Sequence, residues 1–75
     1  MTLIAPRIAV DPEVCHGKPV IAGTRVLVSI VVGAVAAGDS FEVIAHEYGI
    51  ALEDIRAALD YAAKRLEEET VRAAP

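Results

Sequence analysis

Two cationic side chains, Lys18 and Arg25, lie in a stretch, residues 17–26, that also concentrates turn-forming residues. Pro19 favours extended backbone at the residue before it, and Gly23 permits the positive φ of a turn. A Lys and an Arg held on such a constrained arm suit contacts with phosphate groups or with a partner's carboxylates. The alternative is that they form ion pairs inside the domain with Asp11 or Glu13 and fix the arm. We treat the following residues as one structural motif: Gly17, Lys18, Pro19, Gly23, Thr24 and Arg25.

Further cations are candidates for contacts with other molecules. Arg56 lies in the expected last helix and joins Lys18 and Arg25 as a candidate for DNA binding. Two acids, Glu53 and Asp54, lie at the leading end of that helix and would repel phosphates, which argues against it as a strong DNA reader. For contacts with a protein partner the candidates are Lys64, Arg65 and Arg72, with plain solvation of all three as the alternative.

Catalytic and metal-binding chemistry finds little support in the sequence. Cys15 and His16 are adjacent, but a metal site needs three or four ligands, and the only other histidine is His46 on a different element. Cys15 fits better as a small apolar filler. No hydroxyl or thiol has an obvious general base and orienting group. We therefore expect no metal, no cofactor and no enzymatic activity.

The chain is expected to begin with a loose terminus, Met1–Pro6, and a short strand, Ile8–Val10. Val20–Ile21 could pair with that strand or with Thr24–Val26, and the register stays open. The apolar spacing then predicts three helices, over residues 28–37, 41–48 and 52–69. The first is apolar nearly all round, which predicts burial on several sides.

The helix ends carry recognisable signals. Ser40 is the expected N-cap of the second helix. Gly49 ends that helix, and the connection 49–51 has the length of a helix-turn-helix turn. Ala51 cannot cap the third helix through its side chain, so we expect fraying at its start. Gly33 interrupts the first helix and is expected to allow a close helix crossing.

Composition bounds the function further. The 75 residues allow one small domain, and 55% of them are apolar, more than one small core can hide. A homodimer, a partner chain or both are expected to cover the excess. Nine of the eleven acids follow residue 38, against four of the seven cations, so the second half is a poor general nucleic-acid surface. A lone cysteine and an apolar run shorter than the about 20 residues of a membrane span favour a cytoplasmic protein without a membrane anchor.

Several of these residues together resemble the DUF433 family of small bacterial proteins. The resemblance runs from about Ile8 to about Leu66 and is carried by Asp11-Pro12, Gly17-Lys18-Pro19, Ile21, Gly23-Thr24-Arg25, Gly38, Tyr48 and Glu53-Asp54-Ile55. It implies a homeodomain-like helical fold with a small β arm. It also implies an antitoxin of a type II toxin–antitoxin pair, beside a PIN-like nuclease whose clustered acids hold a divalent metal.

Residues and resemblance combine into one prediction. The fold is expected to be mainly α: a three-helix, helix-turn-helix bundle with a short N-terminal β arm, in a single domain over residues 1–75. The arm and loop take residues 8–27, the bundle residues 28–69, and a flexible tail residues 70–75. The predicted function is an antitoxin that inhibits a PIN-like ribonuclease, forms a homodimer and binds operator DNA to regulate its own operon. Alternatives are a stand-alone DNA-binding regulator and a structural dimerisation module.

Overall fold

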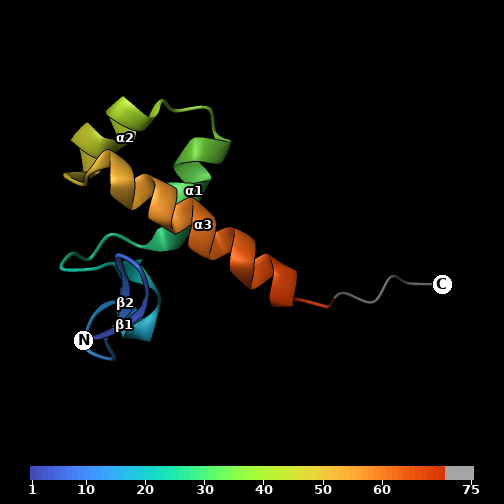
Figure 1. Cartoon of the computed structure of the whole chain (residues 1–75). Helices are drawn as coiled ribbons and strands as arrows, with labels where there is room; N and C mark the ends of the chain where they lie inside the picture. The colour runs from blue at the N-terminus through green and yellow to red at the C-terminus, as the bar shows by residue number, and fades with distance from the viewer. Residues whose placement is uncertain (71–75) are drawn as a thin grey trace.

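A computed structural model describes residues 1–70 of the chain. It contains a three-stranded antiparallel sheet and three helices (Figure 1). The strands are β1 (Thr2–Ala5), β2 (Ile8–Val10) and β3 (Val20–Ile21), in the order β1-β2-β3, and a short 3₁₀ turn, Cys15–Gly17, precedes β3. The helices are α1 (Val28–Ala36), α2 (Phe41–Tyr48) and α3 (Leu52–Glu68). None of the helices in residues 1–70 is long and apolar enough to cross a bilayer.

The fold is mixed α and β, so the prediction of a mainly α chain was wrong. The difference lies at the N-terminus, where Met1–Pro6 was expected to be loose. Thr2–Ala5 instead forms β1, which pairs antiparallel with β2. The tight connection between them places Arg7 at a φ of 65°, a conformation that glycine usually supplies. Without a glycine there, the sequence carries no ordinary hairpin signal.

The sequence left two pairing partners open for Val20–Ile21, and the structure contains backbone hydrogen bonds to both of them. β3 pairs with β2, with Ile8 opposite Ile21 and Ala9 opposite Val20. The chain then turns back, and the Ile21 N–H donates to the Val26 carbonyl at 2.9 Å. The arm is thus a small sheet with a tight return segment on its far edge, and it leads directly into α1.

The core lies where the sheet meets the crossing of the three helices. Its fully buried large side chains come from β2, β3 and each helix: Ile8, Ile21, Val31, Ile44 and Ile55. Only Val28 and Val31 of α1 are buried, while Ile30 stays 45% exposed. The single chain therefore covers one side of α1, and the predicted burial on several sides was wrong for it.

The predicted helix ends are largely confirmed. The Ser40 hydroxyl accepts a hydrogen bond from the Val43 N–H at 3.2 Å, and Gly49 takes a φ of 65° after α2. At the start of α3 the Asp54 carboxylate accepts the Ala51 N–H at 2.9 Å. This bond is half of a capping box. Asp54 thus supplies one capping hydrogen bond at a helix start where Ala51 has no side-chain acceptor, and α3 begins at Leu52.

Candidate functional site

The Gly17-Lys18-Pro19 triplet connects the sheet to α1 through its backbone. The Lys18 N–H donates to the Cys15 carbonyl at 3.1 Å and closes the 3₁₀ turn. The Pro19 carbonyl accepts the Val28 N–H at 3.0 Å, so it holds the first turn of α1, whose N-terminal N–H groups have no intrahelical partner. The Lys18 side chain is left exposed. The backbone of the triplet therefore has a structural role, while its one charged side chain is exposed to solvent.

The Gly23-Thr24-Arg25 triplet forms the turn after β3. The Thr24 hydroxyl donates to the Ile21 carbonyl at 2.8 Å and accepts the Val26 N–H at 3.0 Å. Gly23 makes the turn possible at a φ of 79°. The Cys15 thiol donates to the Arg25 carbonyl at 3.5 Å, which ties the two triplets together. The Arg25 side chain is exposed like that of Lys18.

The alternative of ion pairs within the arm is not realised. Within residues 1–70, neither Lys18 nor Arg25 forms an ion pair. Asp11 instead accepts the Glu13 N–H at 2.9 Å and lies 3.7 Å from the Met1 amino group. Both cations are thus available to an outside anion.

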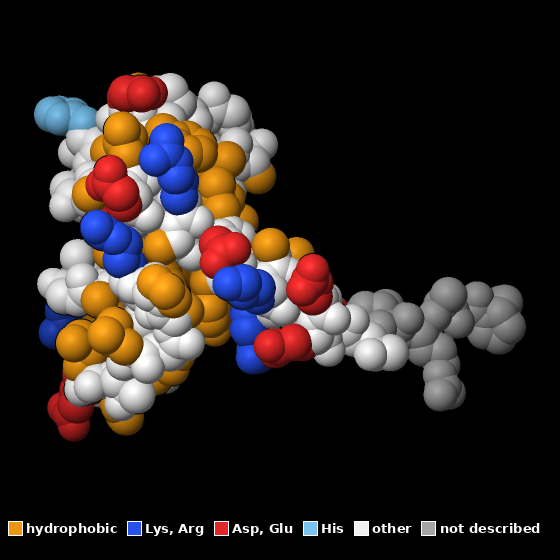
Figure 2. Space-filling view, in the orientation of Figure 1, with side chains coloured by type: hydrophobic (Ala, Val, Ile, Leu, Met, Phe, Trp, Pro, Cys, Tyr) orange, Lys and Arg blue, Asp and Glu red, His pale blue; other side chains and the backbone are white. Residues whose placement is uncertain are grey.

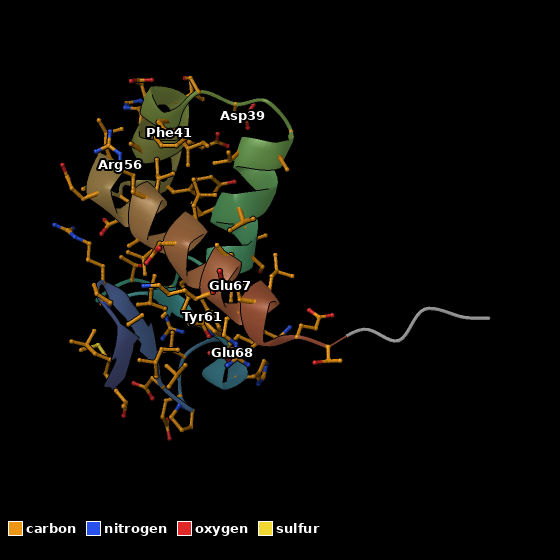
Figure 3. The ribbon with its side chains drawn as sticks, turned by 45° about the vertical axis from the view of Figure 1, so that its right-hand side comes forward. Asp39, Phe41, Arg56, Tyr61, Glu67 and Glu68 are labelled. Carbon is orange, nitrogen blue, oxygen red and sulfur yellow. The ribbon has the colours of Figure 1, made fainter. Side chains whose placement is uncertain are left out.

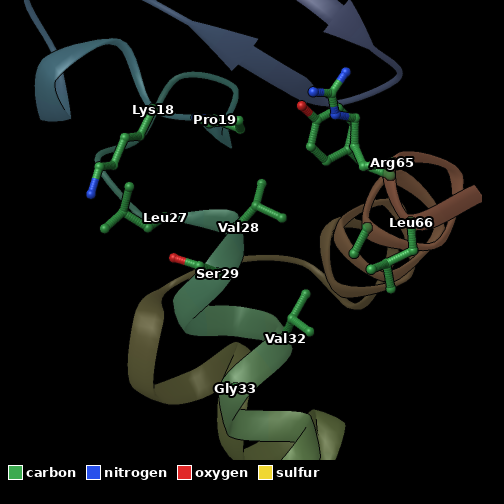
Figure 4. Close-up of a pocket in the computed structure, with 11 residues that line it drawn as sticks. Lys18, Pro19, Leu27, Val28, Ser29, Val32, Gly33, Arg65 and Leu66 are labelled. Atoms are coloured by element: carbon green, nitrogen blue, oxygen red, sulfur yellow. The ribbon is translucent and has the colours of Figure 1, made fainter. Parts of the chain in front are cut away.

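A groove of about 630 Å³ opens between the start of α1 and the C-terminal half of α3, and we call it the α1–α3 groove (Figure 4). Lys18 lies at its arm side and Arg65 on its α3 side. The structure thus brings together one predicted DNA contact and one predicted partner contact. Arg25 lines a separate hollow of about 400 Å³ near Asp11. The remaining walls of the α1–α3 groove are mostly apolar: Pro19, Leu27, Val28, Ser29, Val32, Gly33, Tyr61, Ala62 and Leu66.

The leading end of α3 carries charges of both signs. Arg56 is exposed on this helix (Figure 3), as is Glu53. Asp54 is occupied by Arg7, whose Nη1 lies 2.9 Å from Asp54 Oδ1. On the face in Figure 2, cations and acids are interspersed and do not form a single basic patch. No local sequence pattern indicates this role of Arg7, because Arg7 and Asp54 are 47 positions apart along the chain.

The C-terminal half of α3 projects beyond the body of the domain (Figure 1). There Lys64 pairs with Asp60 at 3.0 Å and Arg65 with Glu68 at 3.2 Å. All four side chains are more than 60% exposed, and such surface pairs contribute between about 0 and 1 kcal/mol. These cations can exchange their own acids for a partner's at little cost. Arg72 lies outside the described residues.

The family described as "Protein of unknown function (DUF433)" matches residues 8–62. This chain belongs to the DUF433 family. The match spans both triplets, the core strands and Arg56, and it ends before Lys64 and Arg65. The part of the chain that matches the family therefore runs from β2 to the middle of α3, while β1 and the projecting end of α3 lie outside it.

One curated sequence and one solved structure, both from Mycobacterium tuberculosis, are similar to the chain. The curated sequence, from strain ATCC 25618 / H37Rv, is named "Putative antitoxin VapB45" and is 38% identical over 53 residues, which are 71% of this chain and 22% of that protein. The solved structure is the crystal structure of Rv2018, which superposes with a TM-score of 0.65 at 36% identity, over 69% of this chain and 24% of that one. The chain thus matches less than a quarter of the length of each.

Proposed function

We propose that this DUF433 chain is an antitoxin of a type II toxin–antitoxin pair and acts by binding, without catalysis of its own. The observation that carries the proposal is the 38% identity to the antitoxin-named relative across 71% of the chain. Because the chain matches 22% of that relative, the relative does not define the toxin. We take the class of toxin from what the DUF433 resemblance implies, and the mode of inhibition from the chain's own surfaces.

The toxin we propose is a PIN-like ribonuclease, whose metal-binding acids would attract an inserted cation. Among the cations in residues 1–70 we choose Lys64, since it lies on the projecting end of α3 and its pair with Asp60 is 69% and 62% exposed. Exchanging Asp60 for a nuclease carboxylate would keep a charge-assisted hydrogen bond to the Lys64 ammonium. In a cleft with less water the attraction between the two charges is stronger, while the desolvation of both groups opposes it.

Operator DNA is a second proposed ligand, through the exposed Lys18, Arg25 and Arg56. The lack of ion pairs for Lys18 and Arg25 in the described residues favours this role. The acids at the leading end of α3 oppose it. Binding would therefore be weak and strongly salt-dependent. A stand-alone DNA-binding regulator would instead bind its site tightly without any toxin.

The test is co-purification from the native operon. The chain carries a tag, its partner is identified by mass, and the partner is then assayed for metal-dependent RNA cleavage with and without the chain. A partner nuclease that loses activity on binding supports the proposal. A partner that is no nuclease, or a nuclease that stays active in the complex, overturns it. Tight operator binding by the chain alone would favour the regulator.

A further inference from the structure

We infer that the α1–α3 groove is a dimerisation site that receives the C-terminal end of α3 from a second copy of this chain. The inference goes beyond the proposed function, because it concerns the isolated chain and needs no toxin. It rests on three features of the described residues: an unexplained glycine, an exposed apolar helix end, and charges that complement each other across the two.

The glycine is Gly33, which lies inside α1 on the wall of the groove (Figure 4). No atom lies within 4 Å of the position where its Cβ would be. The described fold therefore gives this glycine no packing role, although a glycine weakens a helix interior. A second helix that crosses α1 closely at this point would occupy the space that a side chain would otherwise fill. The close crossing expected from the sequence is then made between chains.

The helix end is the projecting part of α3. Leu66 is 66% exposed there although it lines the groove, and Tyr61 and Ala62 on the same wall are only half-buried. Each copy thus offers an apolar helix surface and, beside it, an apolar groove. In a two-fold dimer the helix surface of each copy meets the groove of the other copy, so one contact is made twice.

The charges favour a second copy over other occupants. Leu66 is followed by Glu67, Glu68 and Glu69, and Figure 3 shows Glu67 and Glu68 at this end of α3. Within residues 1–70, Glu67 and Glu69 form no ion pair, and neither does Lys18 at the other side of the groove. Seating the helix end across α1 brings this acidic run toward Lys18. The chain therefore carries both the groove with its cation and a matching apolar, acidic helix end.

Sedimentation velocity on the purified chain tests the inference. The expected mass is twice the 7.9 kDa of one chain. Lys18→Glu and the double variant Glu67→Lys/Glu69→Lys should each weaken self-association at least tenfold, because each places like charges across both contacts. An equimolar mixture of the two variants should recover the wild-type dimer, since each contact in the mixed dimer again pairs opposite charges. Circular dichroism checks that each variant is folded.

Two further variants complete the design. Gly33→Leu should block dimerisation while it favours the α1 helix itself. Glu42→Lys/Glu47→Lys makes the same charge change on α2 and should leave the dimer intact. A monomeric wild type, reversals without effect, or a mixture that does not recover the dimer would overturn the inference. Because no nuclease is present, these outcomes leave the antitoxin proposal to its own test.

Discussion

Arg7 and Asp54 join the sheet to the start of α3: the guanidinium Nη1 lies 2.9 Å from Asp54 Oδ1. The second carboxylate oxygen, Oδ2, accepts the Ala51 N–H at 2.9 Å. One side chain therefore anchors the β1–β2 connection and caps α3 at the same time. The arm and the helices depend on each other through this carboxylate as well as through the core.

Replacing Asp54 by Ala should lower the free energy of unfolding by about 1 to 2 kcal/mol, since the cap and the ion pair are both lost. Asp54 is mostly buried, at 14% side-chain exposure, so its loss should be felt more than that of a surface acid. Urea denaturation measures the change, with Glu53→Ala as the matched control on the exposed neighbour. Equal effects of the two substitutions would contradict the linking role of Asp54.

Arg7 should show opposing effects of its backbone and its side chain. Arg7→Ala removes the ion pair but keeps a φ of 65° on a residue with a Cβ. Arg7→Gly removes the same pair and relieves the backbone, so it should be more stable than Arg7→Ala by about 1 kcal/mol. Urea denaturation of the two variants side by side gives the difference. A glycine variant less stable than the alanine variant would show that the positive φ at position 7 does not strain the backbone.

Thr24 should be required for its hydroxyl. Thr24→Val keeps the shape but leaves the half-buried Val26 N–H without its partner, which should cost about 1 to 3 kcal/mol. Thr24→Ser retains the hydroxyl and should cost much less. Thermal and urea unfolding of both variants provide the measurement. If Val were tolerated as well as Ser, the turn would not depend on these two hydrogen bonds.

The sequence predicted the helices better than the sheet, for physical reasons that single residues illustrate. Ser40 and Gly49 are strong local signals, and α2 spans the residues expected from them. The hairpin was missed because Arg7 takes a left-handed conformation that its residue type does not announce. The exposed side of α1 was not predicted, because apolar spacing along a helix indicates an apolar face. It does not show whether residues of the same chain cover that face.

The residues of the candidate site could be identified from the sequence, but their positions relative to one another in space could not. The two triplets were identified from their Gly, Pro and Thr, and the structure assigns them turns and hydrogen bonds. Lys18 and Arg65 line the same groove because of the way α3 crosses α1, and no local sequence signal encodes that crossing. The pairing of Arg7 with Asp54 depends on the same crossing.

Lys64 should matter for inhibition and leave dimerisation unchanged, because it does not line the α1–α3 groove. Lys64→Glu should weaken inhibition of the partner nuclease by at least tenfold, whereas Lys64→Arg should preserve it. Nuclease inhibition assays on both variants provide the measurement, and sedimentation velocity confirms that the dimer is retained. Full inhibition by Lys64→Glu would place the inhibitory contact elsewhere on the chain.

The most direct test of the antitoxin proposal is a titration of the purified chain into the partner nuclease from the same operon, with RNA cleavage measured at saturating divalent metal. The proposal predicts that cleavage falls to background at a fixed, near-stoichiometric ratio of chain to nuclease. Cleavage that continues unchanged at a large excess of folded chain would contradict it.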